Sequence, residues 1–146
     1  MTEADFRFKH SQLIGYYQFI EWRLKAICAA MLADEEKGWF ERLDDFESDP
    51  FGMLIQKVQS LQTQKRIMLL SQEDVTALTA LRQDRNYWVH TCFNGNAQVL
   101  PIVFNKGELR RSNFAQDLTK SLNEAIEWDE KLVKISKQLK DILKDH

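Results

Sequence analysis

The chain has 146 residues, of which 44% are hydrophobic and 29% are charged, and it contains only 5 glycines and 2 prolines. This composition predicts one globular domain over residues 1–146 and excludes a disordered or collagen-like chain. The net charge of −2 argues against a protein that binds nucleic acid through its overall charge, but it leaves room for an enzyme with a small basic site.

The first predicted helix runs from about residue 5 to residue 33. Its apolar residues alternate at spacings of four and three, which is typical of a seam in a helix bundle. These residues are Leu13, Tyr17, Ile20, Leu24, Ile27 and Met31. Glu21 lies beside the seam. The acidic segment 33–50 that follows contains Trp39, Phe40, Leu43 and Phe46, which favour a short amphipathic helix.

Two further helices are predicted between residues 50 and 93. One starts at Pro50, which suits the first helical turn, and runs to about Leu61, followed by a connection over residues 62–70. Ser71 is a good N-cap for the next helix, which extends to Phe93. The sequence Asn94-Gly95-Asn96 then predicts a helix stop.

The last third of the chain is predicted to hold a small irregular hairpin or loop and one long helix. Residues 97–111 are rich in β-prone side chains but interrupted by Pro101, and the turn is expected around Gly107. The final helix begins at Ser112 or Asn113 and shows another seam of alternating spacings. Its last part carries Lys131, Lys134, Lys137, Lys140 and Lys144. These lysines either form a solvated face that complements the helix dipole or bind phosphate. Together the elements predict an all-α bundle of four to five helices.

Arg85 occupies an unusual position in the third long helix. At about 100° per residue it projects from the middle of an apolar arc. The arc consists of Leu78, Leu81, Trp88, Val89 and Cys92. A guanidinium is almost never buried without a partner. Arg85 therefore forms an ion pair with a residue such as Glu21, extends its stem to the surface, or faces an interface.

Arg85 and Asn86 are followed, after a three-residue spacer, by His90. This hexapeptide, on a late helix of an all-α chain, resembles the signature of the HEPN (higher eukaryotes and prokaryotes nucleotide-binding) superfamily. The likeness in helical layout spans most of the chain, whereas the motif covers six residues. The resemblance implies a metal-independent endoribonuclease, a hydrolase that cleaves RNA in a composite cleft between two protomers.

The residue types of the motif suit this chemistry. A neutral His90 can take the proton of a ribose 2′-hydroxyl, and Arg85 can stabilise the charged transition state. Asn86 can donate a hydrogen bond to phosphate or orient His90. In an α-helix, residues five apart lie about 140° apart, so two copies related by a two-fold axis would suit the site better than one.

Several residues are candidates for supporting roles. Glu21 could orient Arg85, while Arg82, Arg110 and Arg111 could contact the RNA backbone; for each of them a structural or solvated role is the alternative. No metal site or cofactor is expected, because the histidines and cysteines lack ligand spacing. Cys28 is expected to be a free buried thiol, and so is Cys92.

The resemblance also implies a biological setting. Such ribonucleases act as toxins or in phage defence, and an antitoxin partner such as a minimal nucleotidyltransferase restrains them. No signal peptide or long uncharged apolar stretch is present, so we expect a cytoplasmic protein without membrane association. The alternative function is a non-catalytic helical module that binds a nucleotide or a protein, which the acidic composition favours.

Overall fold

The computed structural model describes residues 1–91, 104–105, 108–109 and 112–144. Its long elements are α1 (Glu3–Leu32), α3 (Phe51–Lys65), α4 (Gln72–Asn86) and α5 (Ser112–Lys144). Its short elements are α2 (Trp39–Arg42), the 3-10 turn η1 (Leu43–Phe46), the π-helical turn η2 (Tyr87–Thr91), β1 (Phe104–Asn105) and β2 (Glu108–Leu109). The predicted all-α bundle with a small hairpin before the last helix is confirmed.

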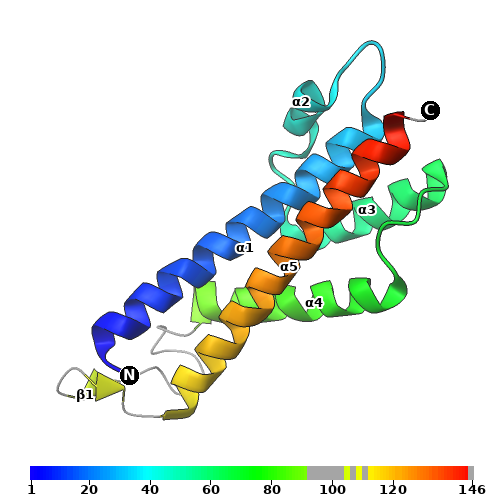
Figure 1. The fold of residues 1–146 in the computed structure, drawn as a ribbon. Coiled ribbons are helices and arrows are strands. Elements are labelled where there is room, and N and C mark those ends of the chain that lie inside the picture. Colours follow the sequence, from blue (N-terminus) through cyan, green and yellow to red (C-terminus); the bar gives the residue numbers. More distant parts are fainter. Residues whose placement is uncertain (92–103, 106–107, 110–111, 145–146) are drawn as a thin grey trace.

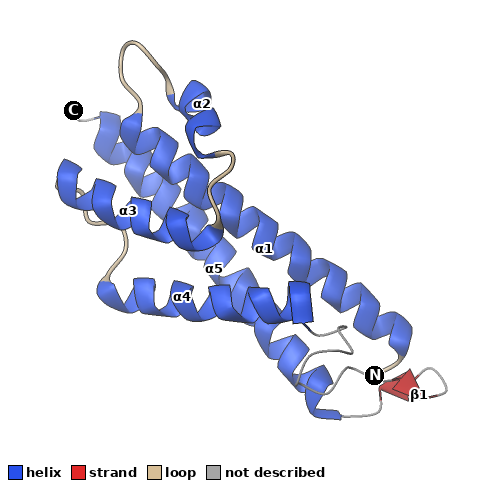
Figure 2. Cartoon of the chain, turned by 180° about the vertical axis from the view of Figure 1, so that it is seen from behind, coloured by secondary structure: helices blue, strands red, loops and turns tan. Residues whose placement is uncertain are grey.

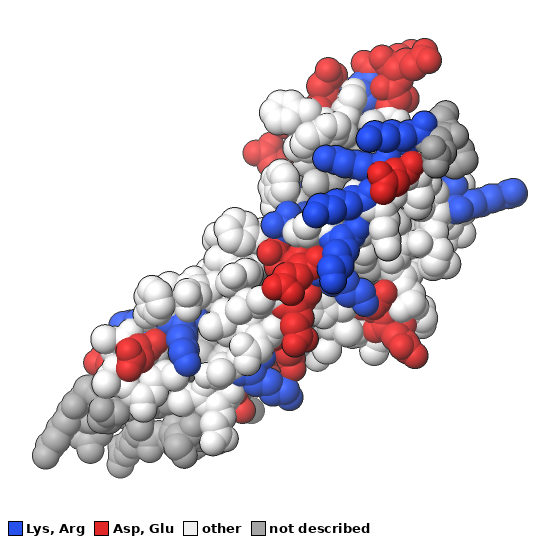
Figure 3. Space-filling view, in the orientation of Figure 1, with Lys and Arg blue, Asp and Glu red and all other residues white. Residues whose placement is uncertain are grey.

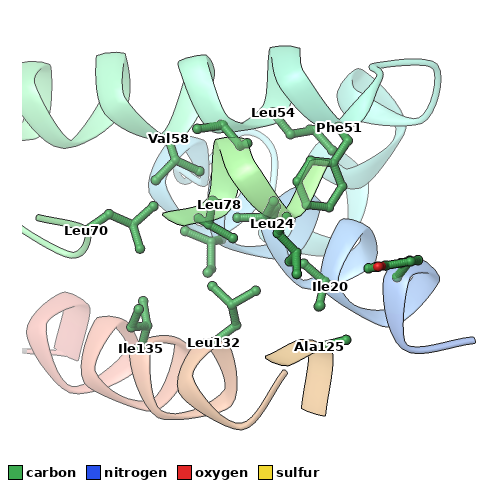
Figure 4. Close-up of a cluster of buried hydrophobic side chains, with 14 of the residues drawn as sticks. Ile20, Leu24, Phe51, Leu54, Val58, Leu70, Leu78, Ala125, Leu132 and Ile135 are labelled. Carbon is green, nitrogen blue, oxygen red and sulfur yellow. The ribbon is translucent and has the colours of Figure 1, made fainter. Parts of the chain in front are cut away.

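The two longest helices, α1 and α5, lie side by side and run in the same direction (Figure 1). The shorter helices α3 and α4 cross them on one face, which is the near face in Figure 2. The hydrophobic core fills the space between these layers, and Figure 4 shows that it draws on all four helices. The predicted seam of α1 is confirmed, since each of its six apolar residues is at most 3% exposed.

Side-chain caps define where two of the long helices begin. The Thr2 hydroxyl accepts a hydrogen bond from the Asp5 amide at 3.1 Å, which starts α1. Ser71 and Asp74 bond reciprocally to each other's backbone amides, so the predicted N-cap at Ser71 forms a capping box. This capping box fixes the first turn of α4, the helix that carries the motif.

Helix α3 runs further than the sequence indicated, to Lys65 instead of Leu61. The added residues are polar and carry no apolar repeat, so periodicity could not reveal them. Arg66 ends the helix with a φ of 56°, in the left-handed region. The buried Gln62 side chain then donates to the Leu70 carbonyl at 3.0 Å and accepts from the amides of Leu69 and Leu70.

The motif helix changes character where the motif lies. It is α-helical to Asn86 and continues as the π-helical turn η2 to Thr91, while the predicted end at residues 92–93 lies outside the described residues. Further on, Phe104 pairs with Leu109 and Asn105 with Glu108 in an antiparallel hairpin. Among the described residues, no helix is both long and apolar enough to cross a membrane.

Candidate functional site

The apolar arc around Arg85 belongs to the core of the single chain. Leu78, Leu81 and Trp88 are at most 3% exposed, and they pack against α1, α3 and α5. Val89, in contrast, is 38% exposed, and Cys92 lies outside the described residues. Of the three alternatives for Arg85, the one in which it and this arc face an interface between two copies is therefore wrong, because the monomer itself buries Leu78, Leu81 and Trp88.

Arg85 lies at the edge of the core and pairs with Glu21 of α1. The guanidinium Nη2 is 3.9 Å from the Glu21 carboxylate, and Nη1 donates to the Asn86 side-chain oxygen at 3.3 Å. The Arg85 side chain is 26% exposed, so it stays partly open to solvent. The predicted ion pair with Glu21 is confirmed, and it explains how a cation can lie so close to the core.

The π-helical turn η2 changes the relation between Arg85 and His90. In an α-helix these residues would lie about 140° apart around the axis. Backbone bonds in a π-helix close over five residues instead of four, so residues five apart lie nearer to one face. His90 is exposed, and so is Asn86. π-helical turns are rare in proteins overall, and those that do occur often lie at functional sites.

Two contacts from other helices hold η2 in place. The His10 ring of α1 lies with Nε2 2.8 Å from the Trp88 carbonyl, and it must donate there because a carbonyl only accepts. The Trp88 indole donates to the Ser121 hydroxyl of α5 at 3.0 Å. The sequence does not reveal the role of His10. Its spacing indicates only that His10, three residues before Leu13, shares the face of the α1 seam.

The side of α4 that faces α5 is acidic. Asp84, Lys120, Ser121 and Glu124 line a cavity of about 210 Å³, and Asp84 and Glu124 also line a larger cleft of about 520 Å³. Burial raises the pKa of Asp84, although Lys120 acts in the opposite direction. An anionic ligand is repelled from this side, so access to Arg85 is favoured from the exposed surface of α4.

Tyr17 of α1 is buried in the core, close enough to this acidic side to feel its charges. Burial raises the pKa of its phenol well above the ordinary value, and the carboxylates of Asp84 and Glu124 raise it further. A phenol is neutral at physiological pH in any case, so Tyr17 adds no charge near the Arg85–Glu21 pair. Sequence analysis had placed Tyr17 in the seam only, because nothing in its spacing pointed to these carboxylates.

Arg82 is the other candidate cation that the structure describes, and its guanidinium lies against α3. The Arg82 guanidinium lies over Gly52 of α3, where an added β-carbon would be 2.7 Å from its central carbon. Arg110 and Arg111 lie outside the described residues. Lys131 binds Asp74 and stacks over Trp128, and basic side chains gather over the half of the molecule where α5 ends (Figure 3). The lysine-rich part of α5 is thus remote from the motif, whose neighbours on α5 are Lys120 to Glu124.

Cys28 is a free, buried thiol as predicted, and burial raises its pKa to about 12. Within the described ranges, no three His, Cys, Asp or Glu side chains are grouped as metal ligands would be. No protein-family model matches the chain, and neither a curated protein nor a solved structure was found to be similar to it.

Proposed function

We propose that the chain is a HEPN-like, metal-independent endoribonuclease whose active residues are Arg85, Asn86 and His90. The observation that carries the proposal is the arrangement at the end of α4. A partly exposed Arg85, held by Glu21, is followed by an exposed Asn86 and, across the π-helical turn, by an exposed His90. These groups form a cation, an amide and an imidazole on one helix end, which suits the cleavage of an RNA phosphodiester.

In the proposed reaction, neutral His90 removes the proton of a ribose 2′-hydroxyl. The 2′-oxygen attacks the neighbouring phosphorus, the bond from phosphorus to the 5′-oxygen breaks, and the leaving oxygen takes a proton from water. One product then ends in a 2′,3′-cyclic phosphate. Arg85 stabilises the charge that develops on the phosphate oxygens, and Asn86 donates a hydrogen bond to one of them.

The wider setting follows from the resemblance. Two copies related by a two-fold axis would place two motifs in one cleft, and the second copy would add a further imidazole there. Activity as a toxin or in phage defence, in the cytoplasm and under the control of an antitoxin such as a minimal nucleotidyltransferase, belongs to the same proposal.

An RNA cleavage assay on matched variants tests the proposal. His90→Ala should lower the rate by about 10²–10⁴-fold, since it removes the general base. Arg85→Ala should lower it by a similar order. The control is Arg42→Ala, because the Arg42 side chain is 25% exposed and pairs with Asp34 and Asp45 far from the motif. Arg42 therefore matches Arg85 in exposure and is also ion-paired, and its loss should leave cleavage unchanged.

Cleavage that survives both His90→Ala and Arg85→Ala would contradict the proposal. A fall in melting temperature for Arg85→Ala with unchanged cleavage would assign the Arg85–Glu21 pair to stability alone.

A non-catalytic nucleotide- or protein-binding module is the second candidate function. The acidic cleft between α4 and α5 favours its protein-binding form, because Asp84 and Glu124 lie on the side of the motif helix that faces this cleft and repel the phosphates of RNA there. Binding of a basic protein partner without any RNA cleavage would support this candidate.

A further inference from the structure

An apolar groove with a basic edge lies between the ends of α1 and α5, away from the motif. Its cavity measures about 490 Å³. Ala26, Ala30 and Leu139 line it, together with Trp22 of α1, Trp39 of α2 and Leu143 of α5. Helices α3 and α4 cross one face of the α1–α5 pair, as Figures 1 and 2 show, and no described residue of either helix lines the groove. This groove is therefore the part of the pair that the bundle leaves uncovered.

The large apolar side chains along the groove are unusually exposed. Trp22 is 50% exposed, Trp39 is 46% exposed and Leu143 is 38% exposed, and the neighbouring Phe19 is 56% exposed. Single exposed apolar side chains are common on protein surfaces, but a continuous patch of them marks a contact surface. The aromatic side chains that line this cavity form such a patch. Tryptophan is also the residue most often responsible for affinity at protein interfaces.

The shape of the groove suits a helix. Ala26 and Ala30 follow Trp22 along α1, Ala33 caps the end of the helix, and small side chains let another helix approach closely. The stretch from Trp22 to Leu32 rises by about 15 Å, which equals nearly three helical turns. Because α1 and α5 run side by side, a third helix can lie lengthwise between them and complete the bundle.

The charge of the groove selects the partner. Lys140 and Lys144 line it, and within the described part of the chain neither has an ion-pair partner; Arg23 also lines it but binds Asp129. Among the described residues that line the groove, none is acidic. A second copy of this chain, docked face to face, would bring these lysines against each other and be repelled.

We propose that this groove binds an amphipathic helix of a partner protein that carries acidic residues beside its apolar stripe. The apolar stripe of the partner helix packs between Trp22 and Leu143, and its acidic residues form ion pairs with Lys140 and Lys144. The inference does not depend on the proposed ribonuclease activity, because the groove and the motif are separate sites.

Two fluorescein-labelled synthetic helical peptides of about four turns test the proposal with the full chain. Both carry leucines at helical spacing; one has glutamates at the flanking positions and the other has lysines. The glutamate peptide should bind at least about tenfold more tightly, measured by fluorescence anisotropy, and its affinity should fall with added salt. Trp22→Ala should weaken binding about tenfold.

Charge reversal provides the sharper comparison. The double change Lys140→Glu and Lys144→Glu should invert the preference between the two peptides. Phe8→Ala and Lys65→Glu serve as controls, because both residues are exposed and neither lines the groove. Circular dichroism checks that each variant keeps its helices.

Three outcomes would overturn the proposal. Equal affinity for both peptides would remove the role of charge, and binding that Trp22→Ala leaves unchanged would place the peptide elsewhere. Self-association that Trp22→Ala abolishes would assign the groove to a second copy of the chain.

Discussion

Within the described part of the chain, the Arg85 guanidinium is held in place without using most of its hydrogen-bonding capacity. At 3.9 Å the contact with Glu21 is an ion pair that is too long for a direct hydrogen bond, and one donor goes to Asn86. A guanidinium has five N–H donors, so the others can serve a ligand or water. Such a side chain is oriented in advance and remains able to bind phosphate.

The pH dependence of cleavage tests the assignment of His90. Only a neutral imidazole can accept the 2′-hydroxyl proton, so the cleavage rate of the wild type should rise with pH as the imidazole loses its proton. EDTA should not change the rate, because the proposed steps use no metal ion. Initial rates from pH 5 to pH 8, with and without EDTA, measure both effects. A flat profile under conditions where chemistry limits the rate, or full inhibition by EDTA, would contradict the mechanism.

The raised pKa of Asp84 predicts how the stability of the protein changes with pH. Burial raises its pKa in the folded state, so the folded protein holds this proton more tightly than the unfolded chain does. Stability from this group is therefore lost as pH rises above the ordinary carboxyl range of about 4. Asp84→Asn should raise the melting temperature at pH 7 by about 1–2 °C and have little effect at pH 3.

The exposed Glu127→Gln is the matched control for Asp84→Asn, since Glu127 lines the same cleft. An Asp84→Asn variant that is less stable than the wild type at pH 7 would show that the carboxylate has a favourable partner instead.

The residues of the site differ in how far the sequence could identify them. The pairing of Arg85 with Glu21 was one of the predicted alternatives, because a cation in an apolar arc requires a partner. Helical periodicity could not show that Trp88 joins the monomer core while Val89 stays exposed, since that depends on where α5 crosses. His10 was missed because its partner is a backbone carbonyl far along the chain.

At the scale of elements, the π-helical turn η2 links the core to the exposed end of α4. It places Trp88 in the core, with its indole bonded to Ser121, while the next residues Val89 and His90 face outward. A turn of this kind depends on a partner for its displaced carbonyls, and His10 supplies one at Trp88. The geometry of the proposed site therefore depends on α1 as well as on α4.

His10→Ala should loosen this turn without touching the proposed active residues. Hydrogen exchange measured by mass spectrometry should increase over residues 87–91, and RNA cleavage should fall. His10→Gln, which keeps a side-chain donor, should restore part of both. Unchanged exchange over the turn in His10→Ala would show that the contact does not hold it.

The hydrogen bonds of Gln62 should stabilise the connection between α3 and α4. Gln62→Ala leaves the backbone groups of Leu69 and Leu70 buried without their partners, so it should lower the free energy of unfolding by about 2–4 kcal/mol. Urea denaturation measures this change, and the exposed Gln64→Ala should be nearly neutral. A loss below about 1 kcal/mol for Gln62→Ala would mean that water replaces the side chain.

The existence of each helix could be predicted because its apolar spacing or its cap is local. The seam of α1 and the cap at Ser71 are examples, and the structure confirms both. The end of α3 could not be predicted, since it is set by the left-handed Arg66 and by bonds from Gln62 to a later segment. The π-helical turn could not be predicted either, because the spacing of apolar residues there is compatible with a continuous α-helix.

At the scale of the whole molecule, the proposed mechanism calls for a symmetric dimer. With the apolar arc buried in the monomer, the reason for a dimer is now the composite cleft that the motif implies. Light scattering at micromolar concentrations should report twice the mass of one chain. Val89→Glu, beside His90, should shift the protein toward monomer, whereas Trp22→Ala in the distant groove should not. A monomer throughout this range would count against the composite cleft.

The parallel arrangement of α1 and α5 also bears on how the protein is made. The first helix makes more contacts with α5 than with any other element, so a large part of its buried stripe lacks its final partner until α5 has left the ribosome. During synthesis, the part of this stripe that packs against α5 is exposed for the time that the chain up to α5 takes to be translated. Contacts so distant in sequence slow folding and lengthen the exposure of apolar surface.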